Sequence, residues 1–323
     1  MANKFLKPSV IANASAGLLL PELVVARTVW TDAVNPGEFV GALDDTVSLR
    51  VPARRTSRKR TLRAGTTIVN DVSNEYSVPV KLDTDVYNGA PITDEELTLD
   101  IVDFGKQILR PQVLAVAEGV EDEIIDEIEG ATYAAGMTID PTDTEYVVSG
   151  ETDWYLVALG ASKALDLKNV PSGDRYLIVG TNVKYGILSS DRFSKYNEVG
   201  PDAADALRRA SLGRIANFEV VHSTKIDPDA AYGYHRTAFV LATRAPAVPR
   251  GVAFAQIQAA NGETAFYNGM SIRWLQDYDY TNTTNRSLVN TYVGTATVKD
   301  PVDIANPNST MRLDRAVKIV EGS

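Results

Sequence analysis

The residue types that carry most enzyme chemistry are scarce in this chain of 323 residues. There are two histidines, His222 and His235, and no cysteine, so disulfide bonds and cysteine-held zinc or iron–sulfur sites are excluded. Both histidines stand in strand-like segments, where an ordinary structural histidine is expected. The sequence contains no Gly-rich phosphate loop, G-x-S-x-G turn or H-E-x-x-H pair. We therefore expect no catalytic residue and no enzyme activity; a hydrolase in the mixed α/β region is the alternative of that class.

Carboxylates offer the nearest approach to a metal site. Asp277 and Asp279 lie two residues apart and would share one face of a strand, where they could hold a divalent cation. This spacing is common, and solvated polar residues on a strand are the simpler explanation. Seven further acids lie between Glu118 and Glu129, but they are spread around a helix instead of facing each other as a catalytic pair. We therefore predict no metal site and no cofactor.

The distribution of charge is more informative. The chain carries 32 Lys and Arg against 42 Asp and Glu, yet residues 50–63, RVPARRTSRKRTLR, hold seven basic side chains and no acid. Crowded like charges repel one another, so such a run persists most easily on an exposed arm that meets opposite charge. The basic residues predicted to make this contact, which we call the basic tip, are Arg54, Arg55, Arg58, Lys59, Arg60 and Arg63.

A candidate for the opposite charge lies between Pro111 and Ser162, where twelve acids occur without one Lys or Arg. The basic tip either folds back on this acidic segment or reaches that of a neighbouring copy, and we favour the second arrangement. Simple solvation and contact with nucleic-acid phosphates remain alternatives. Base stacking is not open to the tip, because no aromatic residue occurs from residue 40 to residue 75. The acids predicted at the intersubunit contact are Glu118, Glu121, Asp122, Glu123, Asp126 and Glu127.

Periodicity predicts the elements that position these charges. Residues 21–30, PELVVARTVW, predict a short core-docking helix, because Pro21 suits a first helical position and apolar residues follow at helical spacing. The segments TVSLRVP, TTIVND and YSVPVKLD alternate like strands, which puts the basic tip at the end of a long two-stranded arm. Such an arm lacks a third layer and is marginal in isolation.

The rest of the chain mixes helix and strand. Residues 93–133 predict helix, with Pro111 either kinking it or beginning a new one, and an apolar row beyond Pro111 predicts about 24 amphipathic residues. Gly119 in this helix indicates close packing or a slight bend. Residues 140–250 alternate helix and strand, and strand-like runs return in 265–323, so the fold class is α+β with a discontinuous domain. No stretch approaches the roughly 20 apolar residues of a membrane span, and no membrane contact is predicted.

The order of these regions resembles that of the HK97-type major capsid proteins of tailed double-stranded-DNA phages. The most specific segments are LLLPELVVARTVWTDAV leading into VSLRVP, VPVKLDTDVYNGAPITDEELTLDIVDF entering the helix, and GRIANFEVVHSTKI with Gly213. The succession of YHRTAFVLATRAP, SIRWLQDYDYT and NTYVGTATVKD extends the match over nearly the whole chain. An encapsulin-like protein compartment shares this fold and is the alternative function.

The resemblance implies five segments. An N-terminal arm would occupy residues 1–37, an extended two-stranded E-loop 38–90, and a P-domain with its spine helix 91–139. An α/β A-domain would occupy 140–262, and the returning strands of the P-domain, with the C-terminus, would occupy 263–323. The family's proteins form icosahedral shells of hexamers and pentamers that enclose double-stranded DNA without sequence-specific binding.

The resemblance also implies partners and a location. The protein is expected in a virion capsid assembled in the host cytoplasm, with a portal protein and decoration proteins as candidate partners. Because only about 35 residues precede the expected E-loop, a separate scaffolding protein is expected as the assembly aid. No covalent crosslink is predicted, since Lys59 is the only lysine of the basic tip and no asparagine can be paired with it from the sequence.

Overall fold

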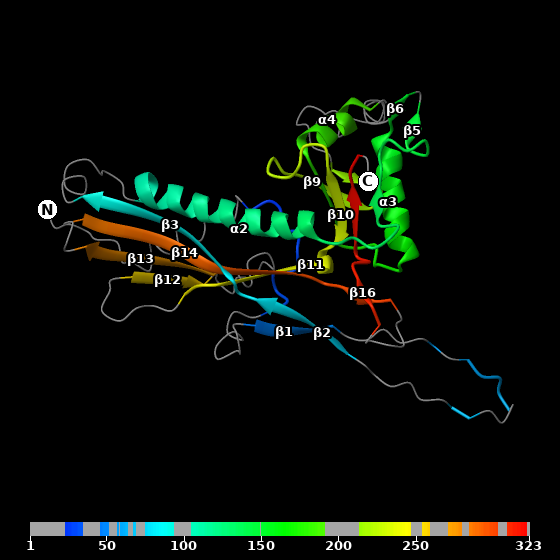
Figure 1. Cartoon of the computed structure of the whole chain (residues 1–323), viewed down its shortest axis with the longest axis horizontal. Helices are drawn as coiled ribbons and strands as arrows, with labels where there is room; N and C mark the ends of the chain where they lie inside the picture. Colours follow the sequence, from blue (N-terminus) through cyan, green and yellow to red (C-terminus); the bar gives the residue numbers. More distant parts are fainter. Residues whose placement is uncertain are drawn as a thin grey trace.

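One long helix, α2 (Arg110–Gly130), lies along a five-stranded antiparallel sheet (Figure 1). The strands of this sheet are β3 (Thr84–Thr93), β11 (Phe239–Arg244), β12 (Phe254–Gln258), β13 (Ser271–Asp279) and β14 (Thr284–Thr297). β14 is central, because it pairs with β3 along one edge and with β13 and then β11 along the other. The computed structural model describes residues 23–34, 46–51, 57, 59–63, 67–68, 75–93, 105–148, 150–190, 213–246, 254–258, 271–279, 284–302 and 309–321.

The start of α2 follows from its sequence. Pro111 lies in the first turn, where its missing N–H costs nothing, and a π-helical turn, η5 (Gly105–Leu109), precedes it. Leu109, directly before α2, is itself helical with φ −69° and ψ −41°, so Pro111 lies where the π-helical turn passes into the α-helix. Val113, Val120 and Ile124 are buried, and the helix packs on β3 and β14. The helix has 21 residues, close to the predicted length.

The second part of the fold is a six-stranded sheet with two helices. Its elements are, in spatial order of the strands, β4 (Thr138–Ile139), β17 (Ala316–Ile319), β10 (Ala231–His235), β7 (Arg175–Val179), β9 (Phe218–His222) and β8 (Arg214–Ile215), with helices α3 (Trp154–Leu167) and α4 (Thr181–Ser189). Asp153 caps α3 by accepting the Tyr155 N–H at 3.0 Å. At the other end, the buried Arg175 donates to Asp166 at 2.6 Å and so holds the last turn of α3 against β7.

Short elements complete the described chain. They are the hairpins β5 (Val147–Val148) with β6 (Glu151–Thr152) and β15 (Asp300–Pro301) with β16 (Met311–Arg312), and the 3-10 turn η7 (Arg236–Ala238). The predicted alternation of helix and strand is present where the structure describes it.

The predicted arm is present, but its base is not isolated. β1 (Thr46–Val51) and β2 (Tyr76–Lys81) pair antiparallel, and the described residues between them extend away from both sheets in Figure 1. One face of the pair, including Leu49 and Val80, packs on Val240 of β11 and Ala296 of β14. The expectation that the arm lacks a third layer is therefore wrong for its base, because alternate residues of both strands are apolar and face the body.

The five-stranded sheet also extends into the segment expected to be E-loop. β3 crosses the expected boundary at residue 90 and pairs with β14 from Thr84, opposite Val293, to Thr93, opposite Thr284. Its inward residues are half-buried or buried beneath α2, as Ile92 illustrates at 1% exposed. The domain boundaries stay predictions.

Residues 23–34 form turns instead of the predicted helix. The Thr28 N–H donates to the Val25 carbonyl at 2.9 Å, and Trp30 then pairs with β11, donating to Phe239 at 3.0 Å. The helix prediction was wrong because these backbone groups find partners in other parts of the chain, among them the carboxylate of Glu121. Such tertiary partners outweigh a propensity of less than about 1 kcal/mol per residue.

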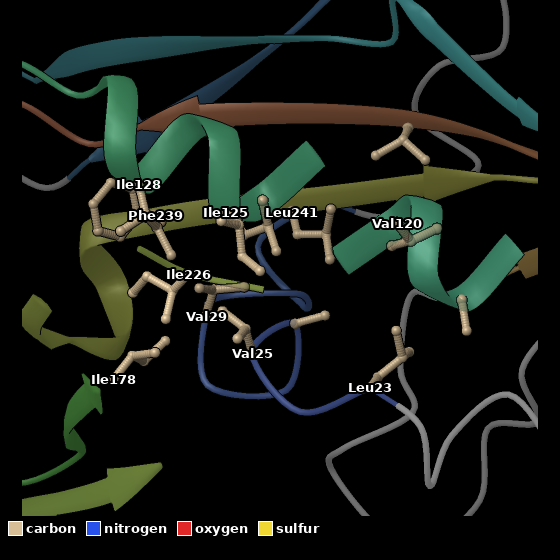
Figure 2. Close-up of a cluster of buried hydrophobic side chains, with 14 of the residues drawn as sticks. Leu23, Val25, Val29, Val120, Ile125, Ile128, Ile178, Ile226, Phe239 and Leu241 are labelled. Atoms are coloured by element: carbon tan, nitrogen blue, oxygen red, sulfur yellow. The ribbon is translucent and has the colours of Figure 1, made fainter. Parts of the chain in front are cut away.

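This segment closes the main core. Figure 2 shows Val25 and Val29 facing Ile125 of α2, with Leu241 of β11 and Ile226 from the loop before β10 beside them, and all five are at most 5% exposed. Full burial of one such side chain contributes roughly 1.5–3 kcal/mol, more than an exposed ion pair at roughly 0.2–1 kcal/mol. Apolar burial therefore joins α2, both sheets and residues 23–34.

We expect Gly119→Ala to destabilise the chain although alanine is the better helix former. A β-carbon at Gly119 would lie 2.6 Å from Cγ1 of Val86 on β3. Alanine gains about 1 kcal/mol in helix propensity, but overpacking against a stiff β-branched side chain costs roughly 1–3 kcal/mol. Urea denaturation of the unassembled chain should show a lower free energy of unfolding, and adding Val86→Ala should recover part of the loss.

Gly130→Ala is the matched control, because no atom lies within 4 Å of the added β-carbon there. Equal stability of the Gly119→Ala and Gly130→Ala chains would contradict the close approach of α2 to β3.

Candidate functional site

The two histidines have structural surroundings. His235 Nδ1 lies 2.9 Å from Thr237 Oγ1 and accepts the Thr237 N–H at 3.3 Å. His222 Nε2 lies 3.5 Å from Thr181 Oγ1. Burial lowers the pKa of both histidines below the ordinary value of 6.5, so both rings are neutral at pH 7. These contacts explain each histidine without a catalytic role.

The carboxylate pair considered for a metal lies on β13. Asp277 pairs with Arg286 and Asp279 with Thr284, both on β14. Among the residues that the structure describes, no group of three or more His, Asp or Glu is placed to hold a metal ion. Within the same residues, no helix combines the length and the apolar character needed to cross a membrane.

The described part of the basic tip is separated from α2 of its own chain. Lys59, Arg60 and Arg63 are exposed, and Arg63 has a φ of 67°, in the left-handed region typical of a turn. In Figure 1 these residues lie at the end of the arm that points away from α2. The described tip is therefore not folded back on its own helix. The remaining residues predicted for it, Arg54, Arg55 and Arg58, lie outside the described residues.

Glu121 is an internal anchor. It is 4% exposed, and its Oε1 accepts the N–H groups of Val25 at 2.6 Å and Ala26 at 3.3 Å. Burial raises the pKa of Glu121, and the hydrogen bonds from these N–H groups oppose this effect only in part. Of the six acids predicted at an intersubunit contact, this one is committed to residues 23–34 instead.

The loop before β10 docks on α2 through two acids. Lys225 Nζ lies 2.6 Å from Asp122 Oδ1 and donates to the Glu118 carbonyl at 2.8 Å. The Asp227 N–H donates to the Glu129 carboxylate at 3.0 Å. The Asp122 side chain is 57% exposed, so this ion pair contributes only about 0.2–1 kcal/mol. These contacts chiefly orient the loop on the helix.

Two more acids of α2 face the five-stranded sheet. Glu123 accepts from Thr84 of β3 at 3.3 Å, and Glu127 accepts from Thr297 of β14. Glu118 and Asp126 are exposed. The acidic helix is therefore divided between contacts within the chain and a smaller outward-facing charge.

A groove of about 490 Å³ opens beside Asp126 at the C-terminal end of α2. β2 contributes Pro79, β14 contributes Thr297, and Glu127 and Lys299 also line it. The last carbonyls of a helix carry partial negative charge, and no basic residue lies in the last turn of α2. With two carboxylates against one lysine, the groove carries a net negative charge.

Sequence reasoning missed the internal partners of the acids. Lys225 lies 103 residues from Asp122, and Thr297 lies 170 residues from Glu127. No periodic signal links positions so far apart in the sequence. For Glu121 a signal existed, because it lies four residues after Ala117 and three before Ile124, which are both buried members of the apolar row.

We expect the stability difference between wild type and Glu121→Gln to depend on pH. A carboxyl group whose folded pKa lies above its ordinary value of 4.5 contributes stability at low pH that is lost as the pH rises through the raised pKa. Glutamine keeps an oxygen acceptor for Val25 and Ala26 but does not titrate. Urea denaturation of the unassembled chain should therefore show wild type gaining on the variant as the pH falls from neutral.

Glu118→Gln removes one exposed negative charge from the same helix and serves as the control. A difference for Glu121→Gln that stays constant with pH, or that grows as the pH rises, would overturn the assignment.

Comparison with known proteins addresses the fold. No family model and no curated protein sequence matches the chain. Among solved structures, "Mycobacterium phage Che8" matches with a TM-score of 0.56 at 16% identity, covering 99% of this chain and 93% of that one. The capsid of Cyanophage P-SCSP1u gives 0.57 at 11% identity, covering 92% and 87%. The capsid of Ralstonia phage GP4 gives 0.59 at 11% identity, covering 99% and 92%. The predicted α+β class is confirmed, and the chain has the HK97-type fold of phage capsid proteins.

Proposed function

We propose that this chain is the major capsid protein of a tailed bacteriophage and that it self-assembles into the icosahedral shell that encloses the double-stranded DNA genome. The observation that carries the proposal is the match of fold to phage capsids along nearly the whole chain, arm included. The surroundings of His222 and His235 add no case for catalysis, so we propose a structural role without enzyme activity.

The geometry of the arm supports assembly. The described tip lies far from its own body, with Lys59, Arg60 and Arg63 exposed at the end of the arm. Leu62 is 85% exposed and Ile68 is 66% exposed, so both side chains are open to contact with another subunit. A protruding arm that meets a different surface of the next copy makes a heterologous contact, and repetition of such contacts closes rings.

We propose that the basic tip meets the exposed acids of α2 on an adjacent subunit. The side chains of Glu118 and Asp126 are exposed on α2, and Asp126 lines a groove that carries two carboxylates and one lysine. Asp122, Glu123 and Glu127 contribute negative potential from positions fixed by internal contacts. Each exposed pair is worth about 0.2–1 kcal/mol, so the effect is collective.

The proposal includes the setting of the shell. Hexamers and pentamers of this chain would form a virion capsid in the host cytoplasm, around a portal and with a separate scaffolding protein. Decoration proteins are further candidate partners. An acidic chain, with a net charge of −10, would enclose DNA without holding it tightly.

Electron microscopy of the purified protein tests assembly. We expect closed particles of megadalton mass, formed with or without a co-expressed scaffolding protein, because the arm extends a contact surface beyond the body of each subunit. Virion-derived protein can also be examined by analytical ultracentrifugation. If it contains only stable monomers or dimers, the proposal is refuted. Particles filled with protein cargo and no DNA during phage growth would favour the encapsulin-like alternative.

Charge reversal tests the intersubunit contact. We expect Lys59→Glu, Arg60→Glu and Arg63→Glu together to reduce particle yield strongly on sucrose gradients, with the urea midpoint of the unassembled chain unchanged. High salt should weaken wild-type particles, because exposed charges are screened beyond about 10 Å at 0.1 M salt.

The matched control reverses three exposed basic residues elsewhere: Arg110, Lys163 and Arg214. Adding Glu118→Lys and Asp126→Lys to the reversed tip should restore part of the yield. Normal assembly of the reversed tip, or equal loss in the control, would refute the contact while leaving the capsid proposal standing.

A further inference from the structure

A polar network joins the base of the arm to the ends of both sheets. Tyr76 of β2 donates its hydroxyl to Asp300 Oδ1 at 2.6 Å. Arg315 holds the same carboxylate with two nitrogens, Nε to Oδ2 at 2.7 Å and Nη2 to Oδ1 at 2.6 Å. Asp300 lies just beyond β14, and Arg315 directly precedes β17. Burial raises the pKa of Tyr76, so its phenol stays protonated and remains the donor.

The network continues into the turn η7. Arg315 Nη1 donates to Thr237 Oγ1 at 2.9 Å, and this hydroxyl lies 2.9 Å from His235 Nδ1. Burial lowers the pKa of His235, and its Nδ1 already accepts the Thr237 N–H. Nδ1 is therefore unprotonated, and the Thr237 hydroxyl donates to it while accepting from Arg315. Hydrogen bonds run without interruption from Tyr76 to the six-stranded sheet.

The apolar seat of the arm has a different character. Leu49 and Val80 belong to a row of aliphatic side chains that packs on Val240 and Ala296. Such contact is non-directional and tolerates rotation, whereas charge-assisted hydrogen bonds fix distance and angle. The side chains of Arg315 and Asp300 are 19% and 21% exposed, so the network lies at the rim of the core, within reach of water.

The arm also has a defined pivot. At Gly294 of β14 an added β-carbon would collide with the carbonyl of Lys81, so the end of β2 crosses β14 with backbone directly against backbone. Tyr76 lies at the other end of β2, about 17 Å away at roughly 3.3 Å per residue. A contact at Tyr76 therefore controls the direction of the arm more strongly than a contact near the pivot.

We propose that Tyr76, Asp300 and Arg315 form a latch that sets the direction of the arm relative to the six-stranded sheet. With the latch closed, β1 and β2 take one orientation. With the latch open, the end of the pair at Tyr76 loosens on its aliphatic seat while the end at Gly294 stays in place, so that one subunit fold can present its tip in different directions.

Spin labelling measures this direction. The chain has no cysteine, so Arg50→Cys on β1 and Lys163→Cys on α3, both exposed, give two defined label positions. Double electron–electron resonance on the full, unassembled chain reports the distribution of distances between them. We expect Tyr76→Phe, which removes only the hydroxyl, to broaden the distribution roughly two-fold, because it frees the far end of a lever about 17 Å long.

Tyr87→Phe is the matched control, since Tyr87 lies on β3 and is 68% exposed. It should leave the width unchanged, and circular dichroism should show native secondary structure in both chains. A folded Tyr76→Phe chain with the width of wild type overturns the latch.

Asp300→Asn, which removes the charge that Tyr76 and Arg315 both hold, gives a second reading if Tyr76→Phe does not fold. Broadening in this variant supports the latch, and an unchanged width refutes it.

Discussion

Burial of the apolar face of α2 is the interaction on which the rest of the structure depends. One core contains Val113 and Val120 of the helix, Val25 of the turns, Ile178 of the six-stranded sheet and Val289 of the five-stranded sheet. Two sheets that could have formed separate domains therefore share a hydrophobic cluster. Removing α2 would expose apolar surface on both at once, which makes their relative placement part of folding.

Because apolar burial is non-directional, polar contacts decide how the parts are oriented around α2. Glu121 fixes residues 23–34, Lys225 fixes the loop before β10, and Glu127 meets β14. The acids of this helix thus act first inside the subunit, and the outward charge is what remains. A helix with seven acids in twelve residues can orient other parts of the subunit and also carry charge on its surface, because its faces meet different neighbours.

Much of this architecture could be predicted from sequence, for physical reasons that differ by element. The row from Val113 to Ile128 repeats with the period of a helix, so this helix was predicted correctly. β7, RYLIV, has the composition of a buried strand and lies within the predicted alternation of helix and strand. Residues 23–34 were not predicted correctly, because their backbone partners lie on Glu121 and Phe239. Contacts across about a hundred residues leave no local pattern, and the same limit hid the internal partners of the acidic helix and the aliphatic seat of the arm.

The chain path at the base of the arm has a mechanical consequence. β2 ends at Lys81 and β3 begins at Thr84, so tension on the arm passes almost directly into β3. β3 is paired with β14 over ten residues and runs away from the arm beneath α2 (Figure 1). Tension along this line loads the hydrogen bonds of the ladder in shear, where they share the force, instead of peeling them apart one by one. The hydrogen bonds between β3 and β14 therefore resist a pull on the arm together, and β3 anchors the arm against tension.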